Sequence, residues 1–481
     1  MVHSMDAKKR IIELMEQKKD LFAGVADQIW GFAETRFSLK QSADLLCEVM
    51  EGEGFKITRG LAGMKDAFIA EYGQGSPVIG ILAEYDALGN MSQNSDVAEP
   101  SPIKAGESGH GCGHHLLGAG AIAGAVGIKD YMEETGLSGT IRLFGCPAEE
   151  SGYGKAFMAR DGVFEGTDIA LTWHPMDSTG LWDFSSLAVL QVYFRFKGRA
   201  AHAAAAPEHG RSALDAAELM NIGVSFLREH IIDEGRIHYA FTDVGGTSAN
   251  VVQPTAELYY FVRAPKMEQA MEIYERVVKV ARGAAMMTET EVEVDFNSAC
   301  ANYLVNRELG KVMYENLKQL APMEYTSEEM EYAKQFYDQL PQTTKLQLAE
   351  KLRMAFPEED SAVISAEADS PLNRLVTPLT FPRKPMSGST DVGDVSWNVP
   401  TAMVVVATAP NGTPAHSWQW VATGKSSIAH KGMMTGAKVI AMTAFDALVN
   451  PETIKKAKEE LKASLSAGGY RSVIPPEVSP R

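Results

Sequence analysis

The chain has 481 residues, of which 45% are hydrophobic and 22% charged, values that exclude a disordered or collagen-like chain. This length predicts two or three domains and excludes a single small binding module. The formal net charge is −17, and no dense run of Lys and Arg outside the termini could follow a phosphate backbone, so we expect no nucleic-acid partner. The four cysteines are scattered, the N-terminus lacks a secretion signal and the longest apolar stretch is short. We therefore expect a cytoplasmic protein with no membrane contact.

The first 180 residues alternate between helical and strand patterns. Apolar residues at helical spacing predict helices over residues 7–34, 40–54 and 118–134. Short apolar runs predict buried strands over residues 78–83, 140–145 and 168–172. This alternation is typical of an α/β domain with a largely parallel sheet.

The order of elements changes after residue 186. Strands are expected at residues 187–196, 237–244, 256–263 and 289–296, and helices at 211–229 and 266–286. The resulting order, βαββαβ, is that of a ferredoxin-like α+β unit. Later segments return to the first pattern, with a helical insertion at about 320–375, a central strand at 401–408 and a helix with a Pro-rich tail at 455–481. We therefore predict a discontinuous α/β catalytic domain over residues 1–185 and 299–481, interrupted by a lid or dimerisation domain over residues 186–298.

The segment from His110 to His115 combines three histidines with one cysteine. If it is extended, the side chains at 110, 112 and 114 share one face and could converge on a metal ion. A thiolate with imidazoles suits zinc or another first-row divalent ion. A Gly-rich turn with incidental histidines is the alternative. A nucleotide-binding loop at the following glycines is disfavoured, because no strand precedes them as that fingerprint requires.

More polar residues follow the predicted strands. Asp86 follows the strand at 78–83, Glu149 and Glu150 follow the strand at 140–145, His174 follows the strand at 168–172, and His416 comes shortly after 401–408. Because parallel strands direct their carboxyl ends into one crevice, we expect these side chains to lie together. One Glu could bind a metal while the other acts as a general base, which favours a two-metal hydrolytic centre. Taken singly, each motif could also be a solvated loop or a structural histidine.

Two turns of the predicted lid also carry polar residues. His202 lies in the small-residue turn 197–207, and Asn250 lies in the polar turn 245–254. If the lid closes over the metals, His202 could donate a hydrogen bond to a developing oxyanion. Ordinary loops with helix caps are the alternative for both turns.

Taken in order, these motifs resemble the amidohydrolase branch of the M20 metallopeptidases over nearly the whole chain. They are Ala83-Glu-Tyr-Asp-Ala-Leu88, His110-Gly-Cys-Gly-His114, Pro147-Ala-Glu-Glu150, the His174 turn, Lys197-Gly-Arg-Ala-Ala-His202 and Ala415-His-Ser417. The stretch 387–397 and the chain length are similar to the group within that branch that cleaves p-aminobenzoyl-glutamate. His115 departs from the pattern, because the branch usually has Asp there.

The resemblance implies a hydrolase of N-acyl amino acids that holds two divalent ions per chain, Mn²⁺ or Zn²⁺. The implied metal ligands are Cys112, His114, Glu150, His174 and His416. The resemblance further implies Glu149 as the catalytic base, Asp86 as a residue that orients a ligand, and His202 as a residue that reaches the active site of a neighbouring subunit. Asn250 and Arg263 would bind the substrate carboxylate.

The resemblance leaves partner and substrate open. A homodimer and a heteromer with a homologous subunit are both compatible with it. Other amino-acid conjugates, such as indole-acetyl amino acids, or dipeptides are alternative substrates. A non-catalytic subunit of a heteromeric hydrolase is the alternative of another class, and the presence of Glu149 with a complete ligand set argues against it.

Overall fold

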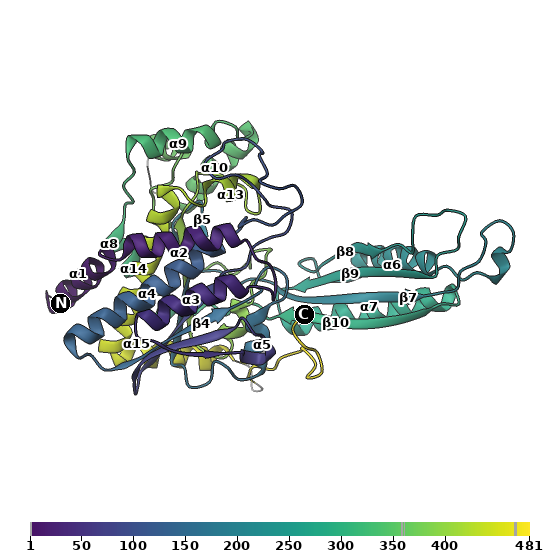
Figure 1. The fold of residues 1–481 in the computed structure, drawn as a ribbon, viewed down its shortest axis with the longest axis horizontal. Helices are drawn as coiled ribbons and strands as arrows, with labels where there is room; N and C mark the ends of the chain where they lie inside the picture. Colours follow the sequence, from purple (N-terminus) through teal and green to yellow (C-terminus); the bar gives the residue numbers. More distant parts are fainter. Residues whose placement is uncertain (1, 357–358, 360, 466–468) are drawn as a thin grey trace. The chain divides into compact units, whose positions relative to one another are not determined.

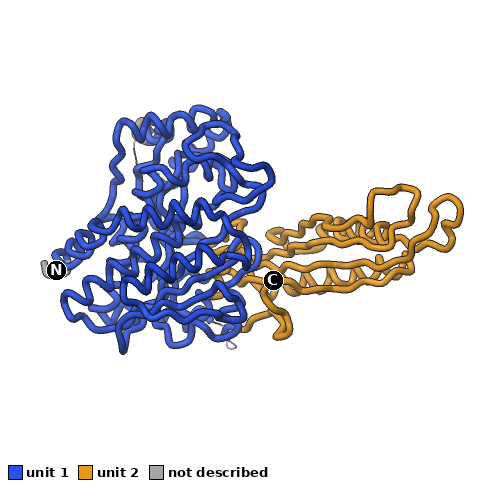
Figure 2. The backbone as a smooth tube through the Cα atoms, in the orientation of Figure 1, with its two compact units in different colours: residues 1–184, 304–382, 395–470 blue, residues 185–303, 383–394, 471–481 orange. Residues whose placement is uncertain are grey.

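The chain folds into two compact units (Figure 2). The structure is a computed structural model and describes all residues except 1, 357–358, 360 and 466–468. The large unit comprises residues 1–184, 304–382 and 395–470. The small unit comprises residues 185–303, 383–394 and 471–481.

A seven-stranded sheet with the order β1-β2-β4-β3-β5-β11-β6 forms the centre of the large unit (Figure 1). Its parallel strands are β3 (Val78–Glu84), β4 (Gly139–Cys146), β5 (Ile169–Met176) and β11 (Thr401–Ala407). Nearly all their residues are buried, as expected for strands of a parallel sheet covered on both faces. The four predicted strands are confirmed, and β5 continues through His174 because it pairs with β11 beyond the end of its pairing with β3.

Three further strands make the sheet mixed, and the sequence pattern did not predict them. They are β1 (Lys56–Arg59), β2 (Phe68–Gln74) and β6 (Gly180–Leu181). All three pair antiparallel with their neighbours. The two-residue β6 and the largely exposed β1 are too short to show a clear hydrophobic period.

Two long helices, α4 (His114–Thr135) and α14 (Ser427–Val449), form the core of the large unit with the sheet. Glycines let both helices pack closely on the indole of Trp173. If Gly120 of α4 carried a Cβ, this atom would lie 2.7 Å from the indole, and a Cβ at Gly436 of α14 would lie 2.6 Å from it. Among the described residues, α14 is the one helix long and apolar enough to cross a membrane, and 78% of its apolar window is buried. Such burial is typical of a core helix.

The single helix predicted over residues 7–34 is wrong. Two helices, α1 (Val2–Glu16) and α2 (Lys19–Phe32), replace it. The break lies at Lys18, whose backbone is not helical and whose ammonium group pairs with Glu53 at 2.5 Å and Asp130 at 2.8 Å. These partners are distant in the sequence, so the apolar pattern alone could not reveal the break.

The other helices complete the fold. The helical insertion predicted at 320–375 contains α9 (Ser327–Tyr337), α10 (Gln342–Ala355) and α11 (Ser361–Ala368). The remaining α-helices of the large unit are α3 (Lys40–Gly52), α5 (Gly154–Arg160), α8 (Arg307–Leu320), α13 (Trp418–Thr423) and α15 (Pro451–Ser464). The short helix α12 (Val392–Ser396) spans the boundary between the two units in the sequence.

The small unit has the predicted βαββαβ order. Its elements are β7 (Ala188–Lys197), α6 (Ala213–Leu227), β8 (Arg236–Asp243), β9 (Thr255–Ala264), α7 (Met267–Met287) and β10 (Glu291–Cys300). The strands form an antiparallel sheet in the order β10-β7-β9-β8, the ferredoxin-like arrangement. The predicted fold class, an α/β unit with an inserted α+β unit, is confirmed.

Candidate metal centre

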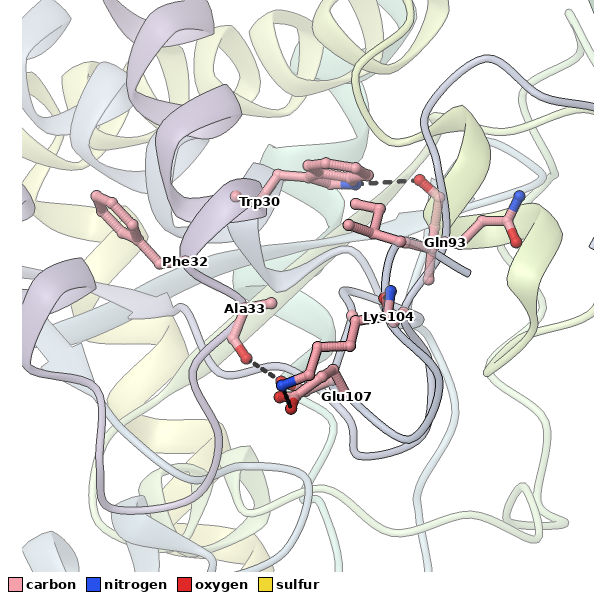
Figure 3. A pocket seen from close by; sticks show the side chains of 12 residues that line it. Trp30, Phe32, Ala33, Gln93, Lys104 and Glu107 are labelled. Carbon is pink, nitrogen blue, oxygen red and sulfur yellow. Dashed lines mark hydrogen bonds and ion pairs between the residues drawn. The ribbon is translucent and has the colours of Figure 1, made fainter. Parts of the chain in front are cut away.

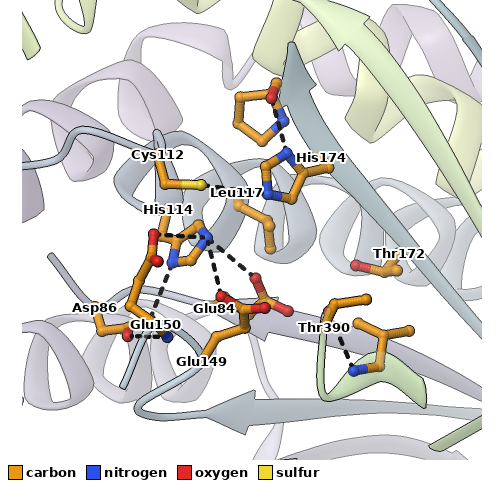
Figure 4. Close-up of polar contacts among 12 residues, drawn as sticks. Glu84, Asp86, Cys112, His114, Leu117, Glu149, Glu150, Thr172, His174 and Thr390 are labelled. Atoms are coloured by element: carbon orange, nitrogen blue, oxygen red, sulfur yellow. Dashed lines mark hydrogen bonds and ion pairs between the residues drawn. The ribbon is translucent and has the colours of Figure 1, made fainter. Parts of the chain in front are cut away.

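The carboxyl ends of the parallel strands bring predicted site residues together (Figure 4). Asp86 follows β3, Glu149 and Glu150 follow β4, and His174 lies within β5. Cys112 and His114 flank the start of α4, with Cys112 beside His174 (Figure 4). Between these two residues Gly113 has φ +81, a left-handed conformation that glycine adopts at little cost and that turns the chain into the helix.

His114 lies at the centre of this cluster. Its Nδ1 lies 3.0 Å from Asp86 Oδ1, while its Nε2 lies 3.4 Å from Glu84 Oε2, 3.9 Å from Glu150 Oε1 and 4.0 Å from Glu149 Oε2. Burial disfavours the imidazolium, but Cys112 in its thiolate form and Asp86 outweigh burial and raise the pKa of His114 well above its usual value. The surroundings of Nε2 thus favour a positive charge there, whether a proton or a metal ion. A histidine held by a carboxylate at Nδ1 is a common arrangement for metal ligation through Nε2.

Two groups of ligand atoms share the sulfur of Cys112. One group is Cys112, His114 and His174, the other is Cys112, Glu150 and His416, and within each the ligand atoms lie within 4.8 Å of one another. Cys112 Sγ lies 3.6 Å from His174 Nε2, and His416 Nε2 lies 3.5 Å from Glu150 Oε1. All five residues predicted as metal ligands therefore belong to these two groups.

The donor atoms of this cluster fit divalent cations. Among the described side chains, His114 Nε2, Glu150 Oε1 and Glu84 Oε2 are buried and have no hydrogen-bond partner. Buried polar atoms without partners are rare and costly, so such a cluster calls for an ion. Burial, together with the Glu150 carboxylate, raises the pKa of the Cys112 thiol, so a thiolate here requires a cation nearby. Thiolate, imidazole and carboxylate ligands together suit a first-row divalent metal.

Asp86 connects two parts of the cluster. Its Oδ1 contacts His114, and its Oδ2 accepts a hydrogen bond of 3.0 Å from the backbone N–H of Glu150. Asp86 is 1% exposed. One carboxylate thus orients an imidazole and fixes the loop that carries the adjacent Glu149 and Glu150.

Glu84 and Lys155 belong to this site, although the sequence motifs did not point to them. Lys155 Nζ lies 2.7 Å from Glu84 Oε1, and both side chains are buried. Burial alone would raise the pKa of Glu84, but Lys155, His114 and His174 hold that pKa below its usual value. The alternation of side chains along a strand could have placed Glu84 on the same side as Asp86. No sequence signal identified Lys155, because its helix α5 was not predicted.

The expectation that His110 shares a face with Cys112 and His114 is wrong, because the segment is not extended. His110 Nε2 lies 3.0 Å from the backbone oxygen of Ile29, and its ring packs 4.8 Å from that of His115. His115 Nε2 in turn contacts the backbone oxygen of Gly424 at 2.8 Å. Burial lowers the pKa of His110 to about 3 and that of His115 well below its usual value. These two histidines are neutral and fix the motif to the core.

A separate cavity of about 330 Å³ lies beside the same segment (Figure 3). It is lined by residues of α2, of the loop that precedes His110, and by Val421. Lys104 and Glu107 pair with each other at its wall. None of the predicted site residues lines this cavity, which is therefore distinct from the metal cluster.

The remaining predicted residues belong to the small unit. His202 and Asn250 lie in neighbouring turns, since His202 forms a bridge with Val251. The ring Nδ1 of His202 accepts hydrogen bonds from the second and third backbone amides that follow it. Arg263 lies near the other end of β9, roughly 25 Å along that strand from the turn that carries Asn250. Its guanidinium donates a hydrogen bond of 2.6 Å to Ser389 Oγ. The turns thus bring His202 and Asn250 together but not Arg263.

Comparisons with known proteins identify the family. Residues 80–420 match the model of peptidase family M20/M25/M40. The chain is 43% identical over 470 residues to one of the subunits of p-aminobenzoyl-glutamate hydrolase from Escherichia coli (strain K12), covering 98% of each chain. It is 26% identical to the Xaa-Arg dipeptidase of Mus musculus over 95% of this chain and 93% of that one.

A solved structure shares the fold. The dinuclear metal-binding M20 peptidase of Bacillus subtilis matches with a TM-score of 0.52 and 18% identity, over 90% of this chain and 99% of that one. The extent of the family match and the identity to the Escherichia coli hydrolase establish that the chain belongs to peptidase family M20/M25/M40.

Proposed function

We propose that this chain is a metal-dependent amide hydrolase that cleaves N-acyl amino acids, with p-aminobenzoyl-glutamate as substrate. The products are p-aminobenzoate and glutamate. One observation carries the proposal: thiol, imidazole and carboxylate ligand atoms gather in one cluster, some of them buried without hydrogen-bond partners, in a chain that is 43% identical, over 98% of its length, to a subunit of such a hydrolase.

The proposed cofactors are two divalent ions, Mn²⁺ or Zn²⁺. Cys112, His114 and His174 would hold one ion, and Cys112, Glu150 and His416 would hold the other. When bound, such ions polarise the amide carbonyl and acidify a water molecule.

Glu149 is the proposed general base. Its Oε2 lies 4.0 Å from His114 Nε2, so its carboxylate is beside the ligand atoms but in neither of the two groups that share Cys112. It takes a proton from the attacking water and returns a proton to the amine nitrogen as the C–N bond breaks. Asp86 keeps His114 and the Glu150 backbone in place throughout. Water and amide thus give one carboxylate and one amine.

The proposed roles of the small unit require a second subunit. His202 and Asn250 lie in exposed turns, so they could enter the site of a neighbouring subunit, where His202 would donate a hydrogen bond to the oxyanion. Asn250 from one subunit and Arg263 from the other would bind the substrate carboxylate, because within one subunit Asn250 precedes β9 and Arg263 lies near the other end of that strand. The edge strand β8 and the helix α6 lie on the same side of the small unit (Figure 1) and carry exposed apolar residues, among them Phe226 at 70% and Ile222 at 53% exposure. We place the interface with a second copy or a homologous subunit on this surface, and light scattering after size exclusion tests it.

Metal analysis combined with an assay for glutamate release tests the proposed function. The purified chain should bind two ions and release glutamate from p-aminobenzoyl-glutamate when Mn²⁺ or Zn²⁺ is added. Glu149→Gln should keep both ions and lose about 10²–10⁴-fold in turnover. The matched control is Glu107→Gln, because that side chain is exposed and pairs with Lys104.

The outcomes separate the parts of the proposal. A chain that binds no metal refutes the site, and a fully active Glu149→Gln variant refutes the assignment of the base. A second candidate substrate class is dipeptides, favoured by the similarity to an Xaa-Arg dipeptidase. Cleavage of dipeptides without release of glutamate from p-aminobenzoyl-glutamate would replace the proposed substrate by that class.

A further inference from the structure

His416 differs from Cys112, His114 and His174 in how the chain holds it. Cys112 and His114 flank the start of α4, and His174 lies within a central strand. His416 instead lies in the segment 408–417 between β11 and α13, and its side chain is 49% exposed. Its backbone has φ +55, a left-handed conformation that is unfavourable for a residue with a Cβ. Surrounding contacts must therefore fix this conformation.

One hydrogen bond holds the backbone of His416 itself, and others hold the segment that precedes it. The backbone N–H of His416 donates to the oxygen of Gly111 at 3.0 Å. Five residues earlier, Asn411 is 2% exposed, and its backbone N–H donates to the oxygen of Pro371 at 2.8 Å. Its side-chain amide donates to the oxygen of Ser370 at 3.2 Å. Pro371 and Ser370 belong to the insertion at 320–375, which has no assigned role.

The insertion also packs on the next residue of the segment. Gly412 has φ +76, and a Cβ there would lie 2.8 Å from methyl groups of both Leu340 and Leu348. On its other side, the N–H of Gly412 donates to Asp177 Oδ2 at 3.0 Å, just after β5. The segment that carries His416 is thus held between the end of a central strand and the insertion.

The insertion is itself fixed to the large unit at two separate places. Glu329 of α9 accepts hydrogen bonds from Ser427 at 2.8 Å and Lys431 at 2.6 Å, both on α14. Tyr332 donates to Asp96 at 2.9 Å, in the loop that leads to the His110 motif. Contacts at two places thus tie α9 of the insertion to the rest of the large unit.

We propose that the insertion at 320–375 is a positioning element for His416, and that it sets the affinity of the ion held by Cys112, Glu150 and His416. The inference rests on the proposed metal site. The ion held by Cys112, His114 and His174 should not depend on the insertion, because Cys112 and His114 flank the start of α4 and His174 lies in β5. Residues that orient a metal ligand typically change metal affinity about 10- to 100-fold when they are altered.

Calorimetric titration of the metal-free full chain with Zn²⁺ or Mn²⁺ tests this inference. The test variants are Asn411→Ala and the double variant Leu340→Ala/Leu348→Ala. Leu346→Ala is the matched control, because Leu346 lies on the same helix as Leu348 and is 62% exposed. His416→Ala identifies the binding step that depends on His416.

We expect Leu346→Ala to bind two ions with the same affinities as the unaltered chain. The test variants should bind the first ion normally and the second about 10-fold or more weakly, in the step that His416→Ala removes. Two unchanged steps in both test variants would overturn the inference and leave the proposed function standing. Equal weakening of both steps would also overturn it, because it would show a general loss of structure. A chain that binds no ion at all would refute the proposed function itself, and the inference with it.

Discussion

Replacing Lys155 by Met tests whether the stability of the large unit depends on the positive charge that Lys155 places beside the buried Glu84. The Lys155 side chain is fully buried, and its Nζ lies 2.7 Å from Glu84 Oε1 on a side chain that is 2% exposed. Removing one partner of such a pair leaves a buried charge uncompensated, at a cost of about 3–5 kcal/mol. A large unit of roughly 340 residues unfolds with about 0.7 kcal/mol/K of entropy. The loss should therefore lower the midpoint of thermal unfolding by about 4–7 °C.

The assay is thermal unfolding followed by circular dichroism, with chelator and then with added Mn²⁺ or Zn²⁺. The decrease caused by Lys155→Met should be largest in chelator, because bound cations would supply part of the missing positive charge. The double variant Glu84→Gln/Lys155→Met should recover most of the loss, since both charges are then absent. Lys458→Met is the control: it removes an exposed ion pair with Asp168 and should cost no more than about 1 kcal/mol. An unchanged midpoint for Lys155→Met in chelator, or no recovery in the double variant, would refute the reasoning.

Two further predictions concern packing and charge. Gly436→Ala places a methyl group 2.6 Å from an indole carbon of Trp173, so it should lower the free energy of unfolding in urea by about 1–3 kcal/mol. The control Gly24→Ala, whose Cβ would have no atom within 4 Å, should be neutral or slightly stabilising. Equal effects of the two variants would contradict the close packing of Gly436 on Trp173. Burial alone would raise the pKa of Glu329, but its ammonium partner on α14 holds that pKa below its usual 4.5. The contribution of Glu329 to stability is therefore complete above about pH 4.5 and is lost as the pH falls through the folded pKa. The stability of Glu329→Gln should therefore decrease less over that pH range than the stability of the unaltered chain. Identical pH profiles of the two proteins would contradict this prediction.

The parallel strands were predictable because their burial appears directly in the sequence. Residues 78–84 and 401–407 are nearly continuous apolar runs, which is typical of strands covered on both faces. Once the strands are placed, the geometry of a parallel sheet directs their carboxyl ends to one edge. This reasoning was sufficient to group Asp86, Glu149 and His174 from the sequence.

What the sequence could not reveal depends on contacts between distant residues. His110 has the same spacing from Cys112 as His114 does, yet its partner is the backbone oxygen of Ile29, 81 residues away. The left-handed turn at Gly113 separates the two histidines, and a Gly in a motif does not by itself fix the sign of φ. Lys155 is a similar case, because only the folded chain brings it to Glu84.

The acidic side chains of the site differ in how far the protein itself compensates their negative charge. Glu84 has a cation of the protein's own, Lys155, and the histidines next to it add to that effect. For Glu150, burial outweighs the opposing effect of His114 and His416 and raises the pKa, and its Oε1 is buried without a hydrogen bond among the described residues. Burial and Glu150 likewise raise the pKa of the Cys112 thiol, against the opposing effect of His114. The folded chain thus compensates the charge of Glu84 internally, whereas Glu150 and Cys112 depend on a bound cation to be charged. Metal binding and the stability of this cluster are therefore expected to be coupled.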